Sequence, residues 1–76
     1  MPRYFFHLRD HLGDVVDEEG LELADDAAAR REGDESVREM FWHDMRYGIA
    51  VGGQRVDVVD SAGVIVAVCQ IPSVVQ

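Results

Sequence analysis

Residues 55–71 read RVDVVDSAGVIVAVCQI, and this stretch decides the fold. Its valine-rich beginning, residues 55–59, is typical of a strand. The next four residues, DSAG, supply a turn whose glycine suits a positive φ. The run from residue 64 to residue 71 then predicts a second strand, which Pro72 ends. The sequence therefore predicts a β-hairpin at this end of the chain.

The second arm of this hairpin is apolar on both faces. Strict alternation places Val64, Val66 and Val68 on one face, and the other face receives Ile65, Ala67, Cys69 and Ile71. A single helix can cover only one face of a small sheet, so the other face needs a cover. We therefore expect a homodimer, formed by sheet-face packing or by edge pairing of strands. The alternative is that residues 72–76 fold over this face.

The beginning of the chain predicts a second pair of strands. Residues 3–9, RYFFHLR, alternate with a period of two and are rich in aromatic side chains, which favours a strand. A turn at residues 10–14 leads into a short strand at residues 15–17. Phe5 and His7 fall on the face opposite Tyr4, Phe6 and Leu8, where they can share the uncovered side of the sheet.

A helix is expected between the two strand pairs. Asp25 or Asp26 is a good N-cap, and Gly48 is the natural end of a helix that runs to about Tyr47. One broad arc of this helix collects its small and apolar residues, Ala29, Gly33, Val37, Met40, Phe41 and Met45. Because glycine costs about 1 kcal/mol relative to alanine inside a helix, either the helix is kinked at Gly33 or another element packs closely there.

These elements predict an α+β fold of order β-β-α-β-β, with a four-stranded antiparallel sheet and one long helix on one face. Residues 1–76 should form a single domain, since neither a linker nor an internal repeat interrupts them. The apolar fraction of 47% is ample for a packed fold. A domain of this size still buries only roughly 60% of its unfolded surface, so its core is thin.

The composition disfavours several classes of function. A net charge of −8 repels nucleic acid and anionic lipid, since non-specific nucleic-acid affinity comes from neutralising phosphates. The sequence lacks a signal peptide and any apolar run of about 20 residues, so we expect a cytoplasmic protein. The basic residues are all arginine and asparagine is absent, which suggests a bacterial origin.

Eight of the fifteen acidic residues fall between Asp10 and Asp26. A calcium loop needs acids at alternating positions around a central glycine, and the spacing of Asp10, Asp14 and Asp17 does not fit. We therefore assign these carboxylates to turns and to a helix cap. The acidic surface would suit a small basic protein as a partner.

Other candidate chemistry is weak. His7 and His11 beside Asp10 could bind zinc, but four positions along a strand separate the two imidazoles by about 13 Å unless the turn folds His11 back. The single cysteine, Cys69, cannot form an internal disulfide and lies in an apolar run, which favours a buried side chain over a nucleophile. The serines have no triad context, so we expect neither an enzyme nor a cofactor.

Four stretches of the chain act as family markers, namely MPRYFFHLRD at residues 1–10, DEEGLEL at residues 17–23, Arg38-Glu39-Met40 in the helix and VDVVDSAG at residues 56–63. Together they resemble a family of short bacterial proteins of unknown function. This resemblance covers nearly the whole chain and implies no particular activity. In arrangement the chain is more distantly similar to HicB-type antitoxin domains, which combine a small sheet with one helix and bind a small basic toxin.

The sequence thus favours a non-catalytic protein-interaction or regulatory module that acts as a homodimer. Trp42 either anchors a partner or packs laterally against residues 49–51. The residues expected to contact a partner are Phe5, His7, Trp42, Ile65, Ala67 and Cys69. The alternative function is a metal- or small-ligand-binding protein that uses His7, His11 and nearby carboxylates.

Overall fold

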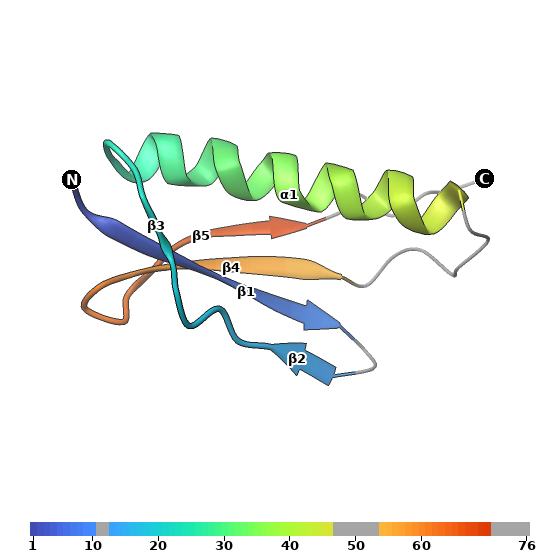
Figure 1. The fold of residues 1–76 in the computed structure, drawn as a ribbon, viewed down its shortest axis with the longest axis horizontal. Coiled ribbons are helices and arrows are strands. Elements are labelled where there is room, and N and C mark those ends of the chain that lie inside the picture. Colours follow the sequence, from blue (N-terminus) through green and yellow to red (C-terminus); the bar gives the residue numbers. More distant parts are fainter. Residues whose placement is uncertain (11–12, 47–53, 71–76) are drawn as a thin grey trace.

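The computed structural model describes residues 1–10, 13–46 and 54–70, and these residues form five strands and one helix (Figure 1). The elements in chain order are β1 (Arg3–Asp10), β2 (Gly13–Val15), β3 (Leu21–Glu22), α1 (Asp26–Arg46), β4 (Arg55–Asp60) and β5 (Ile65–Gln70). The predicted α+β class, with an antiparallel sheet and one helix, is confirmed. The sheet gains one short strand, β3, that the sequence did not predict.

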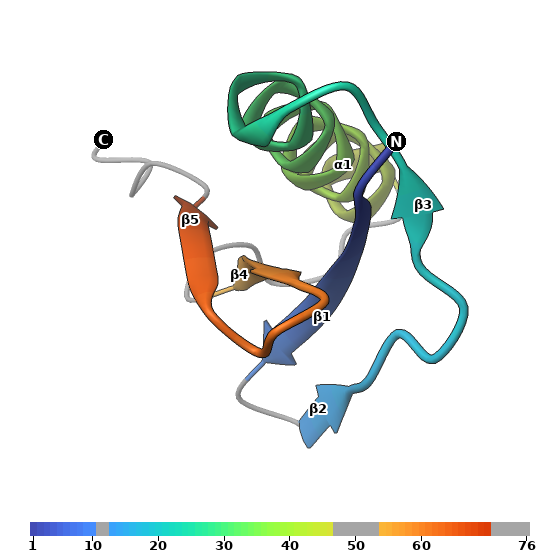
Figure 2. The same cartoon turned by 90° about the vertical axis from the view of Figure 1, so that its left-hand side faces the viewer.

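All strand pairs are antiparallel, and the main path through the sheet is β2-β1-β4-β5. β1 is the strand that connects the two halves, because it pairs with β4 along one side and with both β2 and β3 along the other. β2 pairs with the end of β1 and β3 with its beginning. Figure 2 shows α1 lying across one face of this sheet.

The core lies between α1 and the sheet, where α1 contacts β4 and β5 most extensively. Its buried apolar side chains come from all four long elements and are Tyr4, Ala29, Val37, Val56, Val58 and Cys69. Phe6 pairs with Val58 and Leu8 with Val56, so these β1 side chains point to the same side as the core valines. The core is thin, as expected for a domain of this size.

Asp25 caps the helix, which confirms one of the two predicted positions. Its Oδ1 accepts the N–H of Ala28 at 2.8 Å, and its carbonyl accepts the N–H of Ala29 at 3.1 Å. The hydroxyl of Tyr4 donates to Oδ1 of Asp26 at 2.6 Å and so ties β1 to the first turn. This hydrogen bond, with burial and the nearby carboxylates, raises the pKa of Tyr4 to about 12. The predicted helix end at Tyr47 and Gly48 lies outside the described residues.

Close packing, rather than a kink, explains the glycine in the helix. A Cβ atom at Gly33 would lie 2.7 Å from Sγ of Cys69 and 2.9 Å from Cγ2 of Val58. The helix therefore lies very close to β4 and β5 at this point. Ala29 and Val37, one turn away on either side, are buried as the predicted arc requires.

The hairpin between β4 and β5 forms as predicted. Oδ1 of Asp60 accepts the N–H groups of Ala62 and Val64, both at 2.9 Å. Gly63 has a φ of +85°, the left-handed conformation that the turn requires. Among the residues that the structure describes, no helix is long and apolar enough to cross a membrane.

Candidate interaction surface

We call the sheet face opposite α1 the open face. Phe5 pairs with Val59 and His7 pairs with Asp57, so these side chains lie together, away from the core. The open face consists of Phe5, His7, Arg9, Arg55, Asp57, Val59, Ile65 and Val68. The alternation in β1 thus placed Phe5 and His7 on the correct face. Their contact with a partner stays a prediction.

An ion network occupies one end of the open face. Nε of Arg9 and Nε of Arg55 each donate to the carboxylate of Asp57 at 3.1 Å. Nη1 of Arg9 also contacts Oδ2 of Asp14 at 3.0 Å. The Asp57 side chain is only 6% exposed. Burial alone would raise its pKa, but the hydrogen bonds and charges of Arg9 and Arg55 outweigh burial and hold the pKa below its ordinary value.

A second carboxylate, that of Asp17, closes the outer side of β1 between β2 and β3. Its Oδ2 accepts the N–H of Phe6 at 3.1 Å, and its Oδ1 accepts the N–H groups of Glu19 and Gly20, both at 3.2 Å. Burial would raise the pKa of Asp17, but these three backbone N–H groups outweigh it and the pKa is lowered. The Asp17 side chain thus accepts a backbone N–H group at the edge of β1 and also shapes the turn at residues 17–20, which we call the DEEG turn.

The structure corrects the predicted faces of the last strand. Val58 pairs with Ala67 and Val59 pairs with Ile65, so Val66 is an extra residue in a β-bulge. The bulge moves Ile65 to the open face beside Val68, whereas strict alternation had put these two on opposite faces. Ile65 is 55% exposed and Val68 is 51% exposed. Ile65 therefore remains a candidate contact residue, and Val68 joins it.

The same correction removes two candidates from the uncovered face. Ala67 packs against the core, and Cys69, 3% exposed, belongs to it. Both lie under α1, so the face assignment from alternation was wrong for them. Burial, with the nearby carboxylate of Asp34, raises the pKa of Cys69 to about 11. The thiol therefore behaves as the small buried side chain that the apolar run had indicated.

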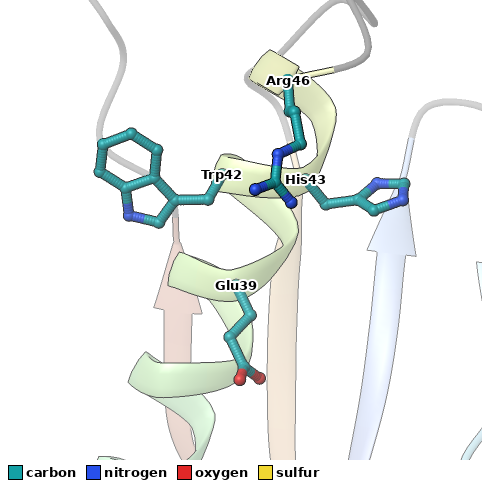
Figure 3. Close-up of a pocket in the computed structure, with 4 residues that line it drawn as sticks. All are labelled: Glu39, Trp42, His43 and Arg46. Atoms are coloured by element: carbon teal, nitrogen blue, oxygen red, sulfur yellow. The ribbon is translucent and has the colours of Figure 1, made fainter.

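A groove of about 570 Å³ lies along the last two turns of the helix that the structure describes (Figure 3). Its described lining residues are Glu39, Trp42, His43 and Arg46. Trp42 projects toward the side of β5 and His43 toward the side of β1. The Trp42 side chain is 64% exposed, which favours the role of an exposed anchor. Its alternative partner, residues 49–51, lies outside the described ranges.

The described residues do not place the histidines proposed for a metal site in a common set of ligands. Nδ1 of His7 accepts the backbone N–H of Asp17 at 3.1 Å. His11 lies outside the described residues. Within residues 1–10, 13–46 and 54–70, no group of three or more His, Cys, Asp or Glu side chains could hold a metal ion.

Sequence reasoning missed the long-range contacts of Asp17 and Asp57. The Asp17 carboxylate was assigned to a turn, and its bonds to Glu19 and Gly20 confirm that assignment. Its other partner, Phe6, is eleven residues away, so no local pattern reveals that contact. Asp57 carried a signal, because a single acid within a valine-rich strand needs a cation when it is buried. Arg55, two residues before Asp57 in the same strand, and Arg9, near the end of the first predicted strand, could have suggested the pairing.

Acidification is expected to destabilise the domain through these two carboxyls. Each has a lowered pKa in the folded chain, so the unfolded chain takes up protons first as the pH falls. The stabilisation that the ionised Asp17 and Asp57 provide is complete above the ordinary aspartate pKa of about 3.9. It is lost as the pH falls through the lower pKa values that these two carboxyls have in the folded chain. Denaturation midpoints measured from neutral pH down to about pH 2 should show this decline.

The variants Asp17→Asn and Asp57→Asn separate the two contributions. Each should lower stability at neutral pH and flatten the acid decline, since part of the linkage is removed. Glu18→Gln, which neutralises an exposed carboxylate in the same turn, is the control. A variant whose decline parallels that of the wild type would show that its carboxyl does not carry the pH dependence.

Comparison with known families places the chain. A family model described as "Domain of unknown function (DUF6894)" matches residues 3–72. No curated protein and no solved structure matches the chain.

Proposed function

The chain belongs to this family of unknown function, and we propose from its structure that it is a non-catalytic protein-interaction or regulatory module that acts as a homodimer. One observation carries the proposal. Several large apolar residues at and beside β5 are exposed to solvent: Val64 is 56% exposed, Ile65 55% and Val68 51%. Contiguous exposed apolar surface of this kind marks interaction sites in soluble proteins.

The size of the domain strengthens this interpretation. Burying an apolar side chain of the valine or isoleucine class is worth about 1.5 to 3 kcal/mol. Among the residues that the structure describes, the buried core has six apolar members, and Val58 is the largest side chain that is fully buried. Covering Ile65 and Val68 against a second copy would therefore add substantially to a small core. Homodimers with this kind of isologous contact are the commonest oligomers.

The organised polar groups favour a structural rather than a chemical role. Asp17 holds a strand edge, Asp57 holds two arginines, and the Tyr4 hydroxyl holds the helix start. Each group is committed to hydrogen bonds within the fold. A binding module needs such rigid elements to present its contact surface.

Light scattering over a concentration series tests the proposal. We expect a species of twice the 8.5 kDa chain mass at micromolar concentration. The dimer should persist at high salt, since an apolar contact is not screened as charge pairs are. A mass of one chain across the whole series would refute the homodimer.

A further inference from the structure

β5 forms an edge of the sheet. It pairs with β4 on one side, and within the described residues no strand pairs with its other side. Edge strands expose a row of backbone N–H and C=O groups that can pair with another chain. The six residues of β5, IVAVCQ, contain neither proline nor a charged side chain, which are the usual means of blocking such pairing.

At the opposite end of the sheet the outer side of β1 is covered by two very short strands, and this contrast with β5 is informative. There β2 and β3 pair with the two ends of β1, and Asp17 accepts the N–H of Phe6 between them. Arg3 adds a contact from Nη1 to the carbonyl of Glu19 at 2.7 Å. The fold therefore covers the outer side of β1 with hydrogen bonds and charged side chains, whereas among the described residues no strand pairs with the outer side of β5 and β5 itself carries no charged side chain.

The distribution of charge makes a second copy a suitable occupant. The chain has a net charge of −8, yet residues 61–76 contain no charged side chain. Two copies of such an acidic protein repel least where they meet along an uncharged segment. Antiparallel pairing of a strand with its own copy is also self-complementary about a two-fold axis.

Exposed apolar groups flank this edge on both sides of the sheet. Ile65 and Val68 lie on the open face. On the helix side, Trp42 projects to the side of α1 on which β5 lies (Figure 3). A partner that added a strand beside β5 could therefore contact Trp42 above the sheet and Val68 below it.

We propose that β5 pairs antiparallel with β5 of a second copy, giving one continuous sheet through the dimer, with Trp42 of each helix against the other copy. This inference rests on the proposed homodimer and specifies its geometry. Edge pairing leaves the Arg9 and Arg55 side chains, which are 31% and 48% exposed, in contact with water around the buried Asp57. Packing two open faces together would instead bury these charges at a desolvation cost.

Three lysine variants at exposed positions test the geometry by sedimentation equilibrium. Val68→Lys and Trp42→Lys introduce a charge on opposite sides of the β5 edge, and Val15→Lys is the matched control on β2, where Val15 is 61% exposed. Edge pairing predicts that both of the first two raise the dimer dissociation constant by about tenfold or more and that the control does not. Circular dichroism checks that each variant is folded.

The outcomes distinguish the two levels of the proposal. A monomeric wild type refutes the homodimer itself. A dimer weakened by Val68→Lys but not by Trp42→Lys means that open faces pack together, which overturns edge pairing while the homodimer stands.

Hydrogen exchange of the β5 amides provides a second measurement. Edge pairing predicts that protection of the outward-facing amides appears only at concentrations where the dimer forms. Equal protection at all concentrations would mean that the chain covers its own edge, for instance with residues 72–76, and would overturn the inference.

Discussion

Gly20→Ala is expected to destabilise the domain by about 2 to 5 kcal/mol. Gly20 has a φ of +73°, a conformation that costs an L-residue about 1 to 2 kcal/mol. A Cβ atom there would also lie 2.8 Å from the carbonyl oxygen of Tyr4 and 2.9 Å from Cε2 of Phe5. Because the carbonyl belongs to a central strand, it cannot move away easily, and the overlap adds about 1 to 3 kcal/mol.

Gly63→Ala is the matched control for this change. Gly63 also has a positive φ, +85°, but apart from Gly63 and its two chain neighbours no atom lies within 4 Å of the Cβ position. It should therefore show the conformational cost without the overlap. Urea denaturation of both variants measures the difference, and equal losses of unfolding free energy would contradict the close contact between the DEEG turn and β1.

The DEEG turn shows what a sequence can and cannot predict about this fold. Its glycine and acids indicated a turn, and the turn is there. The reason for those residue types is not local, since Asp17 binds the backbone of Phe6 and Gly20 packs against Tyr4. Only the path of the chain in space brings β1 next to the turn, so the sequence pattern identified the feature without its function.

The candidate interaction surface shows a similar division. Alternation placed Phe5 and His7 correctly because β1 is regular over that stretch. In β5 the bulge at Val66 shifts the alternation by one residue. The prediction assumed strict alternation, so it separated Ile65 from Val68 and grouped Ile65 with Ala67 and Cys69. An apolar strand provides no polar side chain that would mark such a shift. The class of fold was therefore predictable, whereas the composition of the exposed face was not.

Gly33→Val is expected to destabilise the domain by about 3 kcal/mol or more. On an exposed helix surface, replacing glycine usually stabilises, by up to about 1 kcal/mol for alanine. At Gly33 the sign should reverse, because even a Cβ atom overlaps Sγ of Cys69 and Cγ2 of Val58. Val58 is fully buried, so it has no free space into which to move. The two further methyl groups of valine would push the helix away from the sheet.

Glu35→Val carries the same side chain at an exposed position of the same helix and should change stability by no more than about 0.5 kcal/mol. The overlap with Cys69 can be isolated further with Gly33→Ala, Cys69→Ala and the double variant. If the contact with Sγ causes the loss, the double variant should lose less stability than the sum of the single variants, since removal of the sulfur makes room for the new methyl group. Strictly additive losses would mean that Val58, and not Cys69, determines how closely the helix approaches the sheet.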